Sequence, residues 1–189
     1  MKKVGILGGT FDPVHIGHLI IADQVMERMK LEEIRFMPNF LPPHKEKVSN
    51  STMEDRLKML ELALRDEAKF RIEDIEVRRG VTSYTYDTMA YLKKREPDTE
   101  FYFIIGGDMV DYLPKWYKID ELIKLVQFVG VNRPGTKGES PYPIQFLEVP
   151  SINISSSMIR EKLKKGESVK FLLPEAVIHY IKENHLYGS

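Results

Sequence analysis

Hydrophobic residues along the chain fall into short runs that alternate with segments in which they recur at helical spacing. Residues 4–7 form an apolar run that ends at two glycines, which predicts a buried strand followed by a tight turn. Between residues 16 and 29 apolar side chains return every three or four positions, as in a helix with one buried face. Residues 34–37 predict a second strand that stops at Pro38, so the chain begins with a strand–helix–strand unit.

The same alternation continues to the end of the chain. Further strands are expected at residues 70–72, 101–105, 126–131 and 144–149, and helices at residues 56–64, 83–94 and from residues 156 and 174 onward. Ser51 and Glu54 have the spacing of a capping box ahead of the helix at 56–64. Residues 39–50 contain two prolines and little periodicity, which predicts a long loop.

This order of elements predicts an α/β fold. We expect a Rossmann-like, doubly wound, mainly parallel sheet with helices on both faces and a small C-terminal helical part from about residue 155. The length of 189 residues fits a single domain that spans residues 1–189. Ligands of such folds bind beyond the carboxyl ends of the strands, so the site is expected at the turns after Leu7 and Ile105 and before Ser156.

Charge and composition remove several classes of partner. The chain has 28 basic and 28 acidic side chains, so no overall field favours nucleic acid or an anionic membrane. No segment approaches the ~20 apolar residues that span a bilayer, and Asp12 and Pro13 interrupt the first apolar run too early for a secretion signal. Cysteine is absent, which excludes disulfides and thiolate metal sites and favours a cytoplasmic location.

Residues 8–18, Gly-Gly-Thr-Phe-Asp-Pro-Val-His-Ile-Gly-His, combine glycines with the start of a predicted helix, which is a design for binding phosphate. His15 and His18 are three residues apart, so both imidazoles lie on one face of the first helical turn. Gly17 leaves room for a base or ribose. The histidines could instead cap the helix or bind a metal ion, but a metal would need more ligands and only Asp12 is close in sequence.

A second group of polar residues stands at the predicted helix start near residue 156. Ser155, Ser156 and Ser157 supply three consecutive hydroxyls, and Arg160 offers a planar, permanently charged fork for phosphate oxygens. Taken alone, this segment is best explained as a serine-capped helix with a solvated arginine. Together with the glycine and histidine motif, it favours a second contact with phosphate.

Both segments resemble motifs of the nucleotidyltransferase superfamily. Residues 8–18 match its Gly-x-Phe-Asp-x-x-His-x-Gly-His pattern, and residues 154–160 are similar to its Ile-Ser-Ser-Thr-x-Ile-Arg motif, with Ser157 where threonine often stands. Further blocks at residues 42–45, 83–88, 106–109 and 116–117 resemble those of bacterial nicotinate mononucleotide adenylyltransferases, in the same order and over most of the length.

The resemblance implies a reaction and a set of residues that perform it. Nicotinate mononucleotide and ATP would give nicotinate adenine dinucleotide and pyrophosphate in NAD biosynthesis, with Mg²⁺ bound through the substrate phosphates and no dedicated protein metal site. The residues implied are His15, His18 and Arg160 for catalysis; Gly8, Gly9, Thr10, Phe11, Gly17, Gly106, Asp108, Ser155 and Ser156 for ATP; and Lys45, Thr85, Trp116 and Tyr117 for nicotinate mononucleotide. Trp116 would stack on the pyridine ring, and N–H groups near Thr85 and Tyr117 would bind the carboxylate.

Several alternatives remain at this point. Another superfamily member is the nearest, such as a pantetheine-phosphate adenylyltransferase or a cytidylyltransferase, and a non-catalytic nucleotide sensor is the second. A sensor would be expected to have lost His18 or Arg160, and both are present. Trp116 alone could be a packing residue, and Lys45 a solvated one. Homo-oligomerisation, the preference for nicotinate over nicotinamide and the movement of residues 39–50 are left open.

Overall fold

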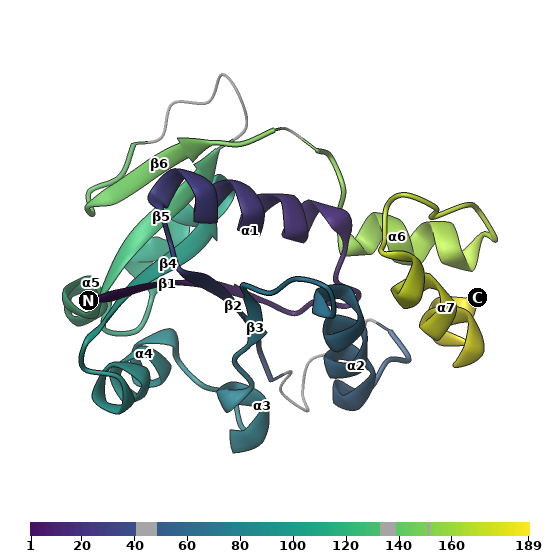
Figure 1. Cartoon of the computed structure of the whole chain (residues 1–189), viewed down its shortest axis with the longest axis horizontal. Coiled ribbons are helices and arrows are strands. Elements are labelled where there is room, and N and C mark those ends of the chain that lie inside the picture. The colour runs from purple at the N-terminus through teal and green to yellow at the C-terminus, as the bar shows by residue number, and fades with distance from the viewer. Residues whose placement is uncertain (41–48, 133–138, 151) are drawn as a thin grey trace.

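A six-stranded sheet forms the centre of the computed structural model, which describes residues 1–40, 49–132, 139–150 and 152–189 (Figure 1). Its strands are β1 (Lys2–Gly9), β2 (Glu33–Pro38), β3 (Phe70–Ile72), β4 (Thr99–Gly106), β5 (Val126–Asn132) and β6 (Ile144–Glu148). They lie in the order β3-β2-β1-β4-β5-β6, and every pairing is parallel. The strand order therefore reverses between β1 and β4, which is where such sheets open a crevice.

Helices cover both faces of this sheet, as the sequence predicts. They are α1 (Ile16–Met29), α2 (Met53–Leu64), α3 (Ile75–Arg79), α4 (Thr85–Arg95), the 3₁₀ helix η1 (Gly107–Lys115), α5 (Ile119–Leu125), α6 (Ser156–Lys164), α7 (Glu175–Glu183) and the 3₁₀ turn η2 (Leu186–Gly188). One hydrophobic cluster joins the sheet to α1, α2, α6 and α7, and a second joins it to α3, α4 and α5. Figure 1 shows α1 above the sheet and α3 and α4 below it.

The strand β4 is buried on both sides, as its unbroken apolar sequence predicts. Tyr102 and Ile104 belong to the cluster with α1, whereas Phe101, Phe103 and Ile105 belong to the cluster with α4 and α5. Successive side chains of a strand point to opposite faces, so a strand in the middle of a covered sheet needs apolar residues at every position. β4 then ends at Gly106, beside the end of β1.

The predicted capping box of α2 is wrong by one residue. The helix begins at Met53, and its reciprocal cap is formed by Thr52 and Asp55, with the Thr52 N–H donating to Asp55 at 2.8 Å. Ser51 does not cap the helix, because its hydroxyl donates to the carboxylate of Asp12 instead. Ser51 could have capped the helix, but its hydroxyl binds Asp12, which lies 39 residues earlier in the chain.

Three short helices are absent from the sequence prediction: α3, η1 and α5. They have five, nine and seven residues, and segments of that length carry too few turns for a clear helical period. The structure has η1 up to Lys115 and α5 from Ile119, so Trp116 lies in a tight connection between two helices.

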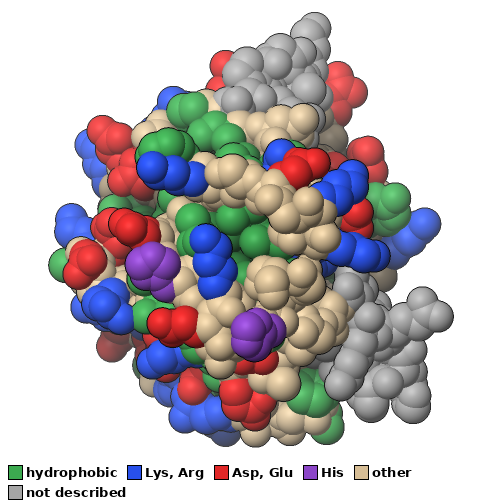
Figure 2. All heavy atoms as spheres, turned by 90° about the vertical axis from the view of Figure 1, so that its right-hand side faces the viewer, with side chains coloured by type: hydrophobic (Ala, Val, Ile, Leu, Met, Phe, Trp, Pro, Cys, Tyr) green, Lys and Arg blue, Asp and Glu red, His purple; other side chains and the backbone are tan. Residues whose placement is uncertain are grey.

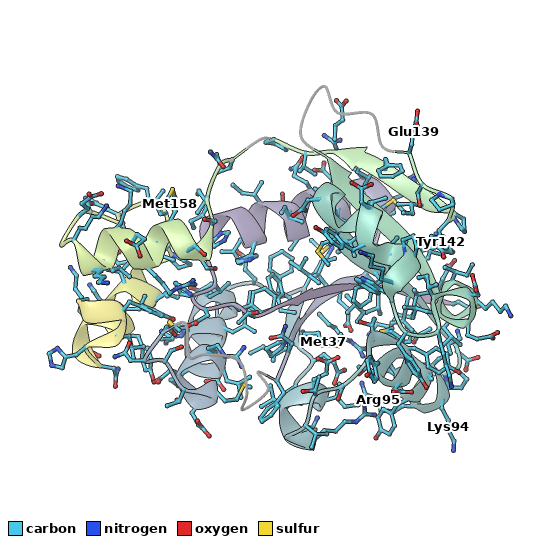
Figure 3. All side chains as sticks on the ribbon, turned by 180° about the vertical axis from the view of Figure 1, so that it is seen from behind. Met37, Lys94, Arg95, Glu139, Tyr142 and Met158 are labelled. Atoms are coloured by element: carbon cyan, nitrogen blue, oxygen red, sulfur yellow. The ribbon has the colours of Figure 1, made fainter. Side chains whose placement is uncertain are left out.

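An ion-pair cluster ties β2 to the end of α4. Arg35 donates to both carboxylate oxygens of Glu96, at 2.8 and 2.7 Å, and lies 3.4 Å from Glu73. Arg95, which Figure 3 labels on α4, lies 2.6 Å from the Glu73 carboxylate. The hydrogen bond from Arg35 lowers the pKa of Glu96 to about 2. Because both charges of each pair are hydrogen-bonded, the cluster can stay largely out of water.

The end of the molecule at which α6 and α7 lie is shown in Figure 2. Basic and acidic side chains are interspersed there around a strip of hydrophobic ones, so neither sign of charge dominates this face. Among the residues that the structure describes, no helix has the length and apolar content to cross a membrane.

Candidate active site

A cavity of about 660 Å³ lies at the point where the strand order reverses. Leu7 borders it from β1, Ile105 and Gly106 from β4, and Ile20 from α1. Its lining continues through Ile154, just before α6, and Glu139, which Figure 3 labels at the top of the view. These are the three turns at which the sequence predicts a ligand. Three residues of the predicted ATP set, Gly17, Gly106 and Asp108, line the cavity together with His15.

His15 and His18 lie side by side at the start of α1, as their spacing predicts. Their rings are stacked, with centroids 3.7 Å apart and an interplanar angle of 25°. His15 is the N-cap residue, and its backbone N–H donates to Nδ1 of His18 at 3.1 Å. A neutral imidazole that accepts at Nδ1 carries its proton on Nε2. His18 is therefore held as a donor at Nε2.

Burial keeps both imidazoles uncharged near neutral pH. It lowers the pKa of His15 to about 4, and burial together with the neighbouring His15 lowers the pKa of His18 to about 3. Within the described part of the chain, Nδ1 of His15 is buried and has no hydrogen-bond partner. An unpaired polar atom in such a place costs free energy unless a ligand satisfies it. The pair thus presents neutral hydrogen-bonding groups rather than fixed positive charge.

The space beside Gly17 is used differently from the sequence prediction. A Cβ atom at this position would lie 3.0 Å from both Nδ1 and Cε1 of His15. The absence of a side chain therefore makes room for the His15 ring, which folds back over the first turn of α1. Gly17 also lines the cavity, so it still borders the space available to a nucleotide.

The N-terminus of α1 offers fewer free donors than the sequence suggests. The N–H of Ile16 donates to the carbonyl oxygen of Leu172 at 2.9 Å, and that of His15 is paired with His18. Two of the donors that a helix start presents to an anion are thus already bound within the protein. Anion binding here relies more on side chains than on the helix end.

Phe11 packs against the ring of His18. Its side chain is buried, its backbone has a left-handed φ of 51°, and its ring meets His18 edge to face at 5.0 Å. The buried side chain of Phe11 is therefore not available to a ligand. Gly8 is exposed, and Gly9 and Thr10 are half-buried, so this part of the motif is open to a ligand.

The two sequence motifs come into direct contact, although they are 148 residues apart. Nη1 of Arg160 donates to the backbone oxygen of Asp12 at 2.8 Å, and Nη2 donates to Ser157 at 3.1 Å. The Ser156 hydroxyl donates to the carbonyl oxygen of Pro13 at 2.9 Å. Ser155 is the N-cap of α6, and its hydroxyl accepts from the N–H of Met158. Arg160 and the serines therefore lie against the histidine motif.

Arg56 is a buried residue of this region that sequence reasoning missed. Its side chain is 1% exposed and donates to the carbonyl oxygens of Thr10 at 2.6 Å and Asn39 at 3.0 Å. It thereby joins the loops that follow β1 and β2. A signal was present in the sequence, because Arg56 shares the apolar face of α2 with Met59 and Leu60. A charged residue on such a face needs buried acceptors.

Asp12 is the second missed residue. Its carboxylate is buried and accepts from the hydroxyls of Ser49 at 2.7 Å, Ser51 and, at 2.6 Å, Tyr187. In the sequence analysis Asp12 is weighed as a metal ligand and belongs to the Gly-x-Phe-Asp motif, but no partner of its carboxylate is predicted. Across the residues with described positions, no three His, Cys, Asp or Glu side chains gather as a metal site would require. Asp12 instead binds three hydroxyls from two other parts of the chain.

The residues predicted to bind a pyridine nucleotide form an aromatic cluster at the start of α4. Thr85 is the first residue of α4, and the ring of Tyr84 before it lies 4.5 Å from that of Tyr117. Trp116 is half-buried and meets Phe103 edge to face at 6.0 Å. Trp116 therefore packs on the core and still keeps an accessible part. Lys45 lies outside the described residues.

The cavity and the aromatic cluster both lie near the carboxyl ends of β1 and β4. The cavity borders α1 and the start of η1, whereas the cluster belongs to α4 and the connection between η1 and α5. Phe103 links the two, because it contacts Trp116 and its Cζ lies 3.4 Å from where a Cβ of Gly8 would be. At Gly9 a Cβ would lie 3.0 Å from the ring of Phe11, so aromatic side chains pack beside both glycines.

Comparisons with known proteins place these features in a family. The model of the family described as cytidylyltransferase-like matches residues 6–162. A protein of Geobacillus thermodenitrificans named probable nicotinate-nucleotide adenylyltransferase is 54% identical over all of this chain and 88% of its own length. A protein of Bacillus cytotoxicus with the same name is 54% identical over the full length of both.

Solved structures share the fold. Plasmodium falciparum nicotinic acid mononucleotide adenylyltransferase complexed with NaAD superimposes with a TM-score of 0.83 at 23% identity, over 100% of this chain and 98% of that one. The same enzyme complexed with APC has a TM-score of 0.80 at 22% identity, over 100% and 98% of the two chains.

The buried histidines make folding stability depend on pH. Both imidazoles have a pKa of 6.5 in the unfolded chain, against about 4 and about 3 when folded. Their contribution to stability is fully present above the unfolded value and is lost as the pH falls below it, because only the unfolded chain takes up these protons. Urea unfolding of the ligand-free protein at pH 7 and pH 5 should show this loss.

Replacing both histidines by asparagine, which also caps helices well, should remove part of that pH dependence. If the double variant loses as much stability between pH 7 and pH 5 as the original protein, the assignment of neutral imidazoles is wrong.

Proposed function

This chain belongs to the cytidylyltransferase-like family, and we propose that its site transfers the adenylyl group of ATP to the phosphate of nicotinate mononucleotide, releasing pyrophosphate. With 54% identity over its whole length to proteins named for that activity, it is a nicotinate-nucleotide adenylyltransferase, which makes nicotinate adenine dinucleotide in NAD biosynthesis. The observation that carries the residue roles is the contact of Arg160 with the backbone of Asp12, beside the stacked histidines.

ATP is proposed to occupy the cavity between α1 and the ends of β1 and β4. The apolar walls suit an adenine ring, and Asp108 offers acceptors for ribose hydroxyls. A Cβ at Gly106 would lie 2.7 Å from the Asp108 carboxylate, so only glycine lets that carboxylate approach the end of β4. The triphosphate would then extend past Gly17 toward His15, His18 and Arg160, with the Ser155–Ser156 helix start beside it.

Nicotinate mononucleotide is proposed to bind at the aromatic cluster. The N–H groups at Thr85 and Tyr117 would hold its carboxylate, which gains from the positive end of the α4 dipole. Nζ of Lys118 lies 4.9 Å above the ring of Tyr86 and 5.2 Å above that of Tyr117, which adds positive charge nearby. Trp116 would stack on the pyridine ring. Lys45 is proposed to approach the substrate phosphate.

The two substrates meet over Gly8 and Gly9. An oxygen of the mononucleotide phosphate forms a bond to the α-phosphorus of ATP, and the bond from that phosphorus to the bridging oxygen breaks, so pyrophosphate leaves. The nucleophile is already ionised, so no side chain needs to attack or to act as a strong base. Catalysis then consists of alignment and of stabilising charge on the phosphates, by Nε2 of His18, by His15 and by the Arg160 guanidinium.

Mg²⁺ is proposed to arrive with the triphosphate. Mg²⁺ keeps much of its water shell and commonly binds through substrate phosphates. When bound, it would neutralise phosphate charge. The protein residues would orient the phosphates around it.

Pyrophosphate release tests the proposed reaction and its acceptor together. With ATP and Mg²⁺, nicotinate mononucleotide should be turned over, and the nicotinamide form should react more slowly because it lacks the carboxylate. Replacing ATP by CTP should abolish release, which separates this activity from a cytidylyltransferase. Equal rates with both mononucleotides would refute the role given to Thr85 and Tyr117. If neither mononucleotide causes pyrophosphate release, a non-catalytic sensor becomes the better explanation.

His18→Ala should lower kcat by about 100-fold or more, because it removes a donor aimed at developing phosphate charge. The free energy of unfolding should fall by about 1–3 kcal/mol, since the His15 N–H loses its acceptor and the contacts of the ring with His15 and Phe11 are lost. His179→Ala on α7, where the side chain is 66% exposed, is the matched control and should keep full activity. A near-normal kcat for His18→Ala refutes the assignment.

Trp116→Phe should raise the KM for nicotinate mononucleotide by about 10-fold and leave the KM for ATP unchanged, because a smaller ring stacks less well. Phenylalanine is preferred to alanine here, since Trp116 also packs on Phe103 and Phe128 and a truncation would leave a void. Equal effects on the two KM values would indicate a general packing role.

A further inference from the structure

The loop at residues 10–13, here called the cradle loop, connects β1 to the histidines of α1. Its polar atoms are bound from separate parts of the chain. Arg56 binds the Thr10 oxygen, Arg160 the Asp12 oxygen, and Ser156 the Pro13 oxygen, while Ser49, Ser51 and Tyr187 bind the Asp12 carboxylate. A loop held at so many points has little freedom to adopt another conformation.

Tyr187 reaches this loop from the last turn of the chain. It is 6% exposed, and its hydroxyl donates to Oδ1 of Asp12 at 2.6 Å. Its N–H donates to the Asn50 side chain at 2.7 Å, and the Asn50 amide donates to the His185 oxygen at 3.1 Å. Burial raises the pKa of the Tyr187 phenol, as does the nearby carboxylate, so the hydroxyl keeps its proton and remains a donor.

We propose that Tyr187 is a positioning residue for the adenylyl transfer, which sets the cradle loop by holding the Asp12 carboxylate. The backbone oxygen of Asp12 accepts a hydrogen bond from Arg160, so a rotation of Asp12 would displace the guanidinium as well. His15 follows Asp12 by three residues, so a movement of Asp12 would also reach the histidines. Tyr187 touches neither reacting group, and it acts through Asp12. The inference rests on the function proposed above for Arg160 and the histidines.

Loss of the Tyr187 hydroxyl should disturb the site because the Asp12 carboxylate is buried. Asp12 is 4% exposed, so water cannot readily replace the missing donor. The carboxylate would then turn toward its remaining serine partners and move the loop with it. Small displacements of groups that align phosphates are costly for the chemical step.

The experiment compares Tyr187→Phe with Tyr180→Phe. Both substitutions remove one tyrosine hydroxyl that donates to a carboxylate, since Tyr180 donates to Asp55 at 2.7 Å. The carboxylate of Asp55 caps α2, and its partners in the described part of the chain are Thr52 and Tyr180 rather than the cradle loop. Tyr187→Phe should lower kcat by about 10-fold with little change in the KM for nicotinate mononucleotide. Tyr180→Phe should keep kcat, even if its melting temperature falls as much.

A second measurement does not depend on turnover. The imidazole nitrogen resonances of His15 and His18 in the ligand-free protein should shift in Tyr187→Phe and stay in place in Tyr180→Phe. Unchanged resonances, or equal losses of kcat in the two variants, overturn the proposal. If the original protein makes no product, the proposed function fails, and the resonances alone decide whether Tyr187 sets the loop.

Ser51→Ala provides a further variant in case Tyr187→Phe does not fold. It removes another hydroxyl donor from the same carboxylate oxygen. The same fall in kcat and the same shift of the histidine resonances are expected. A folded Ser51→Ala protein with normal kcat and unshifted resonances counts against the proposal.

Discussion

Buried oxygens of the loop after β1 must be hydrogen-bonded, and this requirement shapes much of the molecule around the site. Residues 11–13 are buried and Thr10 is half-buried, so donors to the oxygens of this loop come largely from the protein. Arg56 from α2 and Arg160 from α6 meet that need. The same bonds draw helices from the middle and the end of the chain onto the end of β1.

The reversal of strand order gives this loop its surroundings. β1 and β4 end side by side, and the helices that follow them diverge to opposite faces of the sheet. A cavity lies between α1 and the start of η1, and an aromatic cluster stands at the start of α4, with Phe103 in contact with Trp116 and beside Gly8. Under the proposed function these are two binding regions, which suits a reaction that links two nucleotides through their phosphates.

Apolar periodicity predicted the strands and the longer helices, because it is a local property, and the fold class that follows from it brings the turns at the strand ends together. α1 begins and ends at the predicted residues, and Arg160 lies where the paired motifs implied. The place of Arg56 on the apolar face of α2 indicates that it is buried, but its partners could not be predicted, because its acceptors are backbone atoms and any residue type supplies them. The hydrogen bond from the Ile16 N–H to Leu172 could not be predicted either, because its acceptor is also a backbone oxygen. Tyr187 depended on how the end of the chain packs, which no local pattern specifies.

The neutral histidine pair has a consequence for the end of the catalytic cycle. Fixed cations would hold pyrophosphate strongly after the bond to the α-phosphorus has broken, since the departing group carries more charge than any single phosphate of ATP. Uncharged imidazoles give directed hydrogen bonds with a smaller electrostatic attraction, which leaves Arg160 as the permanent charge among the three groups. Under the proposed roles, the site would stabilise the transition state and still release its product, so that release need not limit turnover.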